Sequence, residues 1–376
     1  MKKLRHLCDS VYSGGTAVKL FFVQHTRWFV FAVILVTVLR ICIGSERGIQ
    51  EILSPHDDLL FLHLAHSIAN GRWLGGFYSL TLAKGCVFPC YIAVSLLSGL
   101  PYLVFLDLTI CATAFLGVAA LRPALNRFWS LLIYTGLVFN PVYFIHQRVL
   151  IQDLFTILLS GMIFCLIACW IRRDLEKKKY LVWIIGAGVF FALLVHLRWE
   201  GIAFIVVFLF FYILFMLDML LHRSNLRGIV IFSLYFILIP LGLYCCVNFP
   251  IRMANWYRYG IAEVLIRNNR DYKGFMGSLF GAAKQLDPAW DIRIPVRREI
   301  LERLYALSPS LKTLKPYLDV SAWYQISNQR FPAEVLKKNP ALASNTKCGF
   351  VQWQLLDAMS SAGYFKKTTG KRPENL

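Results

Sequence analysis

The sequence predicts an all-α polytopic membrane protein with about seven transmembrane helices and a small, mainly helical C-terminal segment. Of the 376 residues, 57% are hydrophobic and only 16% are charged, whereas soluble domains are about half apolar and a quarter charged. Most of the apolar residues gather in runs of about 20, the length that crosses a bilayer as a helix. Aromatic residues reach 15%, which suits long membrane interfaces, where Trp and Tyr concentrate.

The predicted spans follow one another along the first two thirds of the chain. They lie at residues 28–44, 101–121, 128–145, 149–171, 181–197, 201–221 and 228–248. A further apolar run at 86–98 is short and ends at Gly99-Leu100-Pro101. We interpret this run as a partial or broken element that leads into the next span, because it is too short to cross a bilayer alone.

The distribution of charge orients these spans. The formal net charge is +19, and such a charge invites a nucleic-acid interpretation. The basic residues, however, gather in short loops between apolar runs, at 122–127, 172–179 and 222–227. Cytoplasmic loops of membrane proteins carry such an excess. We therefore expect a multi-pass protein of the inner (cytoplasmic) membrane, with a cytoplasmic N-terminus, an extracytoplasmic C-terminus, lipid as its partner and no nucleic-acid partner.

The chain divides after the last predicted span. Residues 1–249 form the transmembrane domain, with 45–85 as a long first extracytoplasmic loop, and residues 250–376 form the extracytoplasmic C-terminal segment. The interleaved Trp and basic residues of this segment suit a surface that faces lipid headgroups. We expect it to pack over the first loop; the alternative is a loosely attached tail.

The first loop carries an acidic pair. Residues 54–58, Ser-Pro-His-Asp-Asp, open a helix that we expect to run to about residue 70. The serine suits the N-cap, the proline suits the first helical position, and Asp57 completes a capping box. One interpretation is therefore structural: Asp57 caps the helix and Asp58 complements its dipole. The other is catalytic, because two adjacent carboxylates and His56 stand directly after a membrane span.

Histidines recur along the same predicted helix. His56, His63, His66 and Asn70 fall on one helical face. This face is either a wet groove with metal ligands or simply the solvated side of the helix. The sequence leaves both alternatives open.

Three basic residues stand at the outer ends of predicted spans: Lys84, Arg148 and Arg198. A guanidinium group matches phosphate in a bidentate way and a lysine supplies a point charge, so these side chains suit contact with a lipid phosphate. The alternative is structural. Lys84 then extends to the headgroups, Arg148 pairs with Asp153, and Arg198 pairs with Glu200.

These motifs resemble a known family. An acidic pair in the first outer loop, a helix that ends Asn-Gly-x-Trp-Leu-Gly and a following Leu-x-Lys-Gly…Pro resemble the polytopic glycosyltransferases of the GT-C superfamily. Among these, the resemblance is to the dolichyl-phosphate-mannose-dependent mannosyltransferases and to the bacterial enzymes that use undecaprenyl-phosphate sugars. It extends to Phe139-Asn140-Pro141 and to residues 197–201. It covers most of the chain, but only the first-loop signature is specific.

The resemblance implies transfer of a sugar from a polyprenyl-phosphate-linked donor to a glycan, lipid or protein acceptor of the cell envelope. Asp57 and Asp58 are then the catalytic residues, one of them as general base, with a divalent cation, Mg²⁺ or Mn²⁺, at this pair if a metal is used. The donor phosphate is then held by the three basic side chains, Lys84, Arg148 and Arg198. The supporting residues are His56, Asp153 and Glu200.

The chain also departs from the superfamily. Further spans usually follow such an outer segment, and the Arg-Trp-Glu site at 198–200 lacks the second acidic residue expected there. A shortened, inactive homologue or non-catalytic scaffold is therefore one alternative. A transporter or flippase of lipid-linked sugars is another. It would use the same basic residues without a general base, but transporters of this kind usually carry internal repeats, and no such symmetry is visible.

Overall fold

The computed structural model describes residues 26–46, 57–77, 80–145, 151–172, 179–221, 226–288, 290, 296–318 and 348–363. Within these ranges the chain is all-helical and contains no strand. Six helical segments among the described residues are long and apolar enough to cross a membrane: α3 (Thr26–Ser45), α6 (Tyr102–Leu121), α9 (Ile151–Ile171), α10 (Tyr180–Leu197), α11 (Ile205–Leu221) with the short helix before it, and α12 (Leu226–Tyr259). The chain is therefore a helical, multi-pass membrane protein, as its composition predicts.

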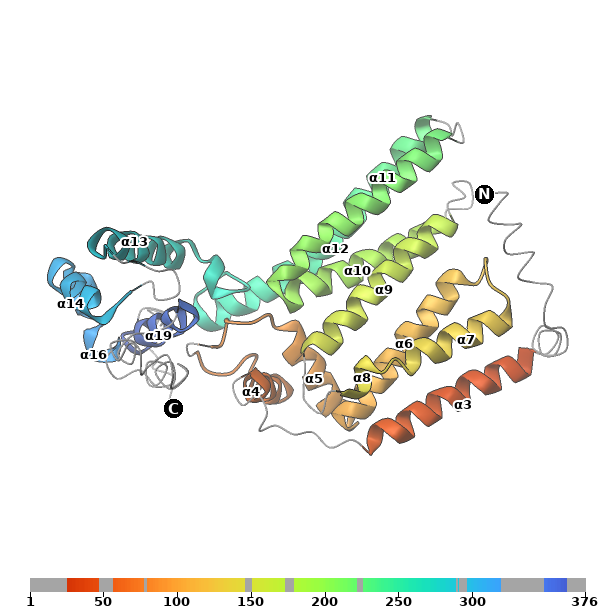
Figure 1. Ribbon diagram of the computed structural model, residues 1–376, viewed down its shortest axis with the longest axis horizontal. Coiled ribbons are helices and arrows are strands. Elements are labelled where there is room, and N and C mark those ends of the chain that lie inside the picture. The colour runs from red at the N-terminus through yellow and green to blue at the C-terminus, as the bar shows by residue number, and fades with distance from the viewer. Residues whose placement is uncertain are drawn as a thin grey trace. The chain divides into compact units, whose positions relative to one another are not determined.

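Shorter elements connect and follow these helices (Figure 1). They are α4 (Asp57–Ala69), α5 (Val87–Ser98), α7 (Arg127–Val138), α8 (Val142–Ile145), η2 (Trp199–Phe204), η3 (Ile266–Asn268), α13 (Arg270–Leu286), α14 (Arg298–Leu307), α15 (Pro309–Lys312), α16 (Lys315–Leu318) and α19 (Cys348–Ser361). The described residues form two compact units. The first takes its residues from 1–62 and 87–247, and the second from 63–86 and 248–376.

In the first unit, α6 and α9 lie side by side and run in the same direction. Arg172, which follows α9, donates hydrogen bonds to the carbonyl oxygens of Ala119 and Ala120 near the end of α6, at 2.6 and 2.7 Å. The chain between the two helices must therefore return along α6, and α7 followed by α8 makes this return (Figure 1). α6 and α9 are the most buried long helices, whereas α3, α11 and α12 expose most of their apolar side chains, as lipid-facing helices do.

The return path differs from the single span predicted at 128–145. The helix ends at Val138 and a second helix begins at Val142, after Asn140-Pro141. Proline has no N–H group to donate, and it disfavours helical backbone at the residue before it. The Asn140 side chain accepts a hydrogen bond from the Val142 N–H at 3.1 Å, which starts the second helix.

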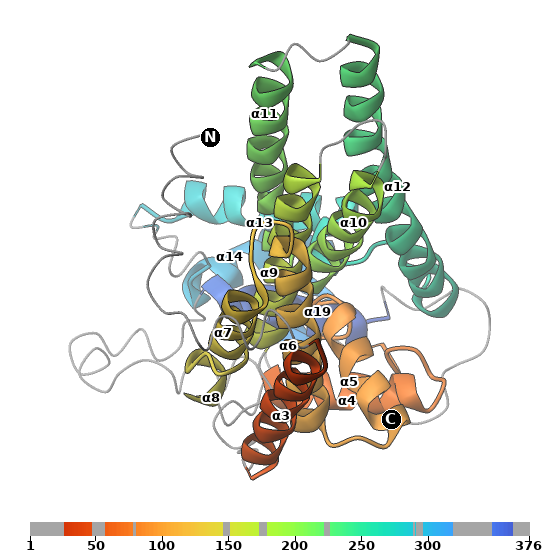
Figure 2. The same cartoon turned by 90° about the vertical axis from the view of Figure 1, so that its right-hand side faces the viewer.

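α11 and α12 form an antiparallel pair, side by side in Figure 2. The rings of Phe215 and Phe232 lie 5.0 Å apart, and the Tyr212 hydroxyl donates to Ser233 Oγ at 3.2 Å. α12 is longer than the span predicted at 228–248. It continues to Tyr259 and, with 34 residues, is about 50 Å long, against a hydrocarbon core of about 30 Å. The helix thus passes residue 249 without a break.

The second unit joins part of the first loop to the C-terminal segment. Trp73 donates from Nε1 to the Asn255 side-chain oxygen at 2.8 Å, and the Tyr259 hydroxyl donates to the Gly75 carbonyl at 3.1 Å. Asn255 is fully buried and donates in turn to the Glu263 carbonyl at 2.7 Å. These hydrogen bonds confirm the prediction that the C-terminal segment packs on the first loop.

Candidate functional site

The first-loop helix α4 turns Asp58 into the protein. Asp58 is only 1% exposed and shares its face of the helix with Phe61 and Ala65, which are also buried. The Phe61 ring packs edge-on against Phe88 of α5, with ring centroids 4.9 Å apart. This aromatic contact fixes the rotation of α4 and so keeps the Asp58 carboxylate on the inward face.

The histidines of α4 lie on a different face from Asp58. His63, His66 and Asn70 are exposed, and Asn70 donates from Nδ2 to the His66 carbonyl at 2.8 Å. Of the two alternatives for this face, the structure supports the solvated side. His56 and the side chain of Asp57 lie outside the described residues.

The described part of the chain contains no set of side chains that could bind a metal ion. There, no three His, Cys, Asp or Glu side chains gather in a way that could hold a metal ion. The described residues therefore do not form the divalent-cation site that the family resemblance allows.

Two buried carboxylates and two tyrosines lie toward the same end of the first unit. Asp58 comes from α4, Tyr91 from α5, Tyr102 from the first position of α6, and Asp153 from the first turn of α9. Asp153 is 5% exposed. The Tyr91 and Tyr102 rings meet edge-on, with centroids 6.3 Å apart. The Tyr102 hydroxyl lies within electrostatic range of both carboxylates. We call these four residues the acidic–tyrosine cluster.

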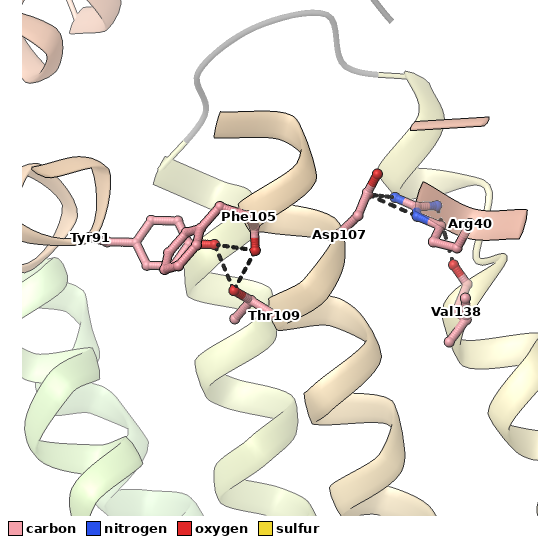
Figure 3. Close-up of polar contacts among 6 residues, drawn as sticks. All are labelled: Arg40, Tyr91, Phe105, Asp107, Thr109 and Val138. Carbon is pink, nitrogen blue, oxygen red and sulfur yellow. Dashed lines mark hydrogen bonds and ion pairs between the residues drawn. The ribbon is translucent and has the colours of Figure 1, made fainter. Parts of the chain in front are cut away.

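The two tyrosines of the cluster differ in their hydrogen bonds. The Tyr91 hydroxyl lies 2.9 Å from Thr109 Oγ1 on α6, and Thr109 itself donates to the Phe105 carbonyl at 2.8 Å (Figure 3). The Tyr91 hydroxyl also lies 3.5 Å from the Phe105 carbonyl, to which it can donate. The Tyr102 hydroxyl is also buried, but it has no hydrogen-bond partner among the described residues.

A buried ion pair lies on the opposite side of α6 (Figure 3). Arg40 of α3 donates from Nε and Nη2 to one carboxylate oxygen of Asp107, at 2.8 and 2.6 Å, and from Nη1 to the Val138 carbonyl of α7 at 3.2 Å. Both charged side chains are 0% exposed. The pair therefore ties three helices together. The sequence analysis missed it, although single charges inside the apolar runs 28–44 and 101–121 were the available signal.

Arg198 and Glu200 lie nearer the surface, where η2 follows α10. Arg198 Nε is 3.4 Å from Glu200 Oε2, and the side chains are 36% and 46% exposed. The pairing expected as the structural alternative is thus present, but an exposed pair contributes only about 0–1 kcal/mol. Phe204 of η2 meets Phe155 of α9 at 5.4 Å, so η2 lies at the end of the first unit that holds Asp153.

Two of the predicted phosphate ligands remain, Lys84 and Arg148. Lys84 is partly buried and belongs to the second unit. Arg148 lies outside the described residues. The structure thus places Asp58, Asp153, Arg198 and Glu200 toward the same end of the first unit.

Gly201 holds η2 close to the end of α10. A Cβ at this position would overlap the Leu194 carbonyl and come within 2.8 Å of the Val195 nitrogen. Because these are backbone atoms, which cannot rotate away, we expect Gly201→Ala to lower the free energy of unfolding by about 1–3 kcal/mol. Thermal unfolding of the purified protein in detergent measures the loss.

Gly136→Ala is the control for that substitution. Gly136 is an exposed helical position in α7 with no atom within 4 Å of an added Cβ. Alanine should be neutral there or stabilise the protein by up to about 1 kcal/mol. Equal destabilisation by both substitutions would contradict the close approach at Gly201.

Comparison with protein-family models, with curated proteins and with solved structures finds no match to this chain. The likeness to the GT-C superfamily therefore rests on the sequence motifs alone.

Proposed function

We propose that the protein is a membrane glycosyltransferase that transfers a sugar from a polyprenyl-phosphate-linked donor to a glycan, lipid or protein acceptor. The observation that supports this most directly is the burial of Asp58, which is only 1% exposed. A carboxylate that only complemented the helix dipole would have no reason to leave water, because burial of a charge is costly. Asp58 is therefore the proposed general base, in preference to Asp57.

The proposed reaction is a displacement at the anomeric carbon of the donor sugar. Asp58 takes the proton of the acceptor hydroxyl as its oxygen attacks that carbon. The bond from the anomeric carbon to the phosphate oxygen breaks, and the polyprenyl phosphate leaves with the electron pair. The Arg198 guanidinium holds the departing phosphate, and Arg148 and Lys84 are further candidates for this contact.

In the proposed topology the acidic–tyrosine cluster faces the extracytoplasmic side of the inner membrane. Basic residues gather at the other end of the first unit, where α6 and α9 finish, in the segments 122–127 and 172–179. The positive-inside rule favours the cytoplasm for that end. α7 and α8 then cross the membrane together as a broken seventh span, and the N-terminus lies in the cytoplasm.

Deletion of the gene tests the proposed function without knowledge of the acceptor. We expect one polyprenyl-phosphate sugar to accumulate and one envelope glycan to disappear, both measured by mass spectrometry of the lipid and glycan fractions. A plasmid copy of the wild-type gene should restore both. Unchanged lipid-linked sugars and glycans in the deletion strain would contradict the proposal. A donor that accumulates only on the cytoplasmic leaflet would favour a flippase.

Substitution of Arg198 tests the phosphate contact. Loss of a hydrogen bond to a charged group costs enough binding energy that Arg198→Ala should raise the donor concentration for half-maximal transfer by about 10-fold. High donor concentration should then restore most of the rate. Glu200→Gln is the matched control, because it breaks the same ion pair but keeps the guanidinium. Equal defects in both variants would assign Arg198 to structure alone.

A further inference from the structure

The hydroxyl of Tyr102 is a buried polar group that the folded protein leaves unsatisfied. It has no hydrogen-bond partner among the described residues. Burial of a hydroxyl without a partner destabilises a protein, and most buried side-chain polar atoms do have one. Tyr91, whose ring centroid lies 6.3 Å from that of Tyr102, shows the usual arrangement, with a hydrogen bond to Thr109. We therefore expect this hydroxyl to form its hydrogen bond with a bound molecule.

The ring of Tyr102 is held in place by its neighbours. It packs against a buried apolar cluster formed by Leu106, Ile110, Tyr143 and Ile157, and it meets Tyr91 edge-on. The ring is partly exposed, whereas the hydroxyl at its tip is buried. Two carboxylates, Asp58 and Asp153, lie within electrostatic range of this hydroxyl.

The chemistry of the cluster selects the kind of group that fits it. A carboxylate only accepts hydrogen bonds, at up to about four lone-pair positions, and a phenol donates one. A ligand hydroxyl satisfies both at once, because it donates to a carboxylate and accepts from the phenol. An ionised phosphodiester, in contrast, only accepts hydrogen bonds and so cannot donate one to a carboxylate.

We propose that the acidic–tyrosine cluster binds a carbohydrate hydroxyl, which accepts a hydrogen bond from Tyr102 and donates one to Asp58 or Asp153. The proposal rests on the proposed function and deepens it, because it separates the sugar contact at Tyr102 from the phosphate contact at Arg198. The hydroxyl belongs either to the donor sugar or to the acceptor glycan. Tyr102 is a binding residue, because in this scheme it donates a hydrogen bond and transfers no proton.

The test uses Tyr102→Phe in the full-length protein in lipid nanodiscs. The probes are a short-chain polyprenyl phosphate that carries mannose, the same lipid with glucose, and the lipid phosphate without a sugar. Bound ligand raises the unfolding temperature, so each probe is titrated against that temperature. We expect wild-type protein to be stabilised more by one sugar-bearing lipid than by the phosphate alone. Tyr102→Phe should keep the stabilisation by phosphate and bind that sugar-bearing lipid about 10-fold more weakly.

A second experiment tests whether the bound hydroxyl belongs to the acceptor. It is the transfer assay, with a membrane glycan extract as the source of acceptor. If Tyr102→Phe binds the donor normally but needs about 10-fold more extract for half-maximal transfer, the bound hydroxyl is the acceptor's. Donor affinity and extract dependence both within twofold of wild type would overturn the proposal and leave the hydroxyl to an ordered water only. Without ligand, Tyr102→Phe should unfold at the wild-type temperature or above it, because it removes an unsatisfied group.

Tyr134→Phe is the matched control. The Tyr134 hydroxyl is hydrogen-bonded to Thr37 Oγ1 at 2.7 Å, between α7 and α3. Its removal should lower the unfolding temperature of the free protein and leave the binding of all three probes unchanged. A loss of sugar-dependent stabilisation in this variant as well would overturn the assignment to Tyr102.

The outcomes separate this inference from the proposed function. Normal transfer with wild-type binding in Tyr102→Phe contradicts the sugar site and leaves the transferase standing. Loss of sugar-dependent stabilisation in Tyr102→Phe, without any transfer by wild-type protein, supports the site and contradicts the transferase. A sugar-binding transporter would then take its place.

Discussion

Replacement of Asp58 by Asn should abolish sugar transfer and leave the protein folded. A general base contributes about 10²–10⁴ in rate, and asparagine cannot accept the proton of the acceptor. Asparagine keeps the size of the side chain and its amide oxygen still accepts hydrogen bonds, so the protein should stay folded. Turnover per folded molecule, membrane yield and the unfolding temperature measure the two effects separately.

Asp57→Asn is the control, because it changes the adjacent carboxylate of the same helical turn. As a helix cap, Asp57 contributes about 1 kcal/mol, so this variant should lose some yield and keep its activity per folded molecule. The reverse pattern, with activity lost in Asp57→Asn and kept in Asp58→Asn, would move the base to Asp57. Full transfer by the double variant would end the enzyme interpretation of this loop.

The acidic pair illustrates which features of the candidate site the sequence can predict and which it cannot. The composition of residues 54–58 predicts both a helix start and a chemically active loop, because cap residues and candidate bases are the same residue types. It cannot separate Asp57 from Asp58, because neighbouring positions differ by a rotation of 100° about the helix axis. The contact of Phe61 with Phe88 fixes that rotation. Because Phe88 lies on another helix, the local sequence around the acidic pair does not predict this contact.

The same limit explains which parts of the fold were predicted. Six of the seven predicted spans coincide with long helices within a few residues at most ends, because an apolar run of about 20 residues is a signal that needs no tertiary context. The seventh was wrong as a single helix. Hydropathy continues across residues 139–141 while the backbone breaks there, and Pro141 was the local sign of that break. The extension of α12 to Tyr259 is held by partners in the second unit, such as Trp73 and Gly75.

The largest loss of stability should follow from breaking the ion pair between Arg40 and Asp107. The two residues are 67 positions apart in the chain, and each is fully buried in a helix long enough to cross the membrane. Asp107→Ala leaves the Arg40 guanidinium without its carboxylate, and an uncompensated buried charge costs about 3–5 kcal/mol. Reversible unfolding in mixed detergent micelles, or the folded yield in membranes, should show this loss.

The double variant Arg40→Met, Asp107→Leu should recover most of that stability, because apolar replacements of similar volume need no partner inside the membrane. The coupling energy between the two positions should then be about 3 kcal/mol, and additive losses would contradict a direct pair. The pair lies on the side of α6 opposite Tyr91 and Thr109 (Figure 3), so the double variant should also transfer sugar normally per folded molecule. A double variant that is folded but inactive would contradict a purely structural role for the pair. Arg40 and Asp107 would then take part in the reaction, as charges that move or stabilise a proton near the acidic–tyrosine cluster.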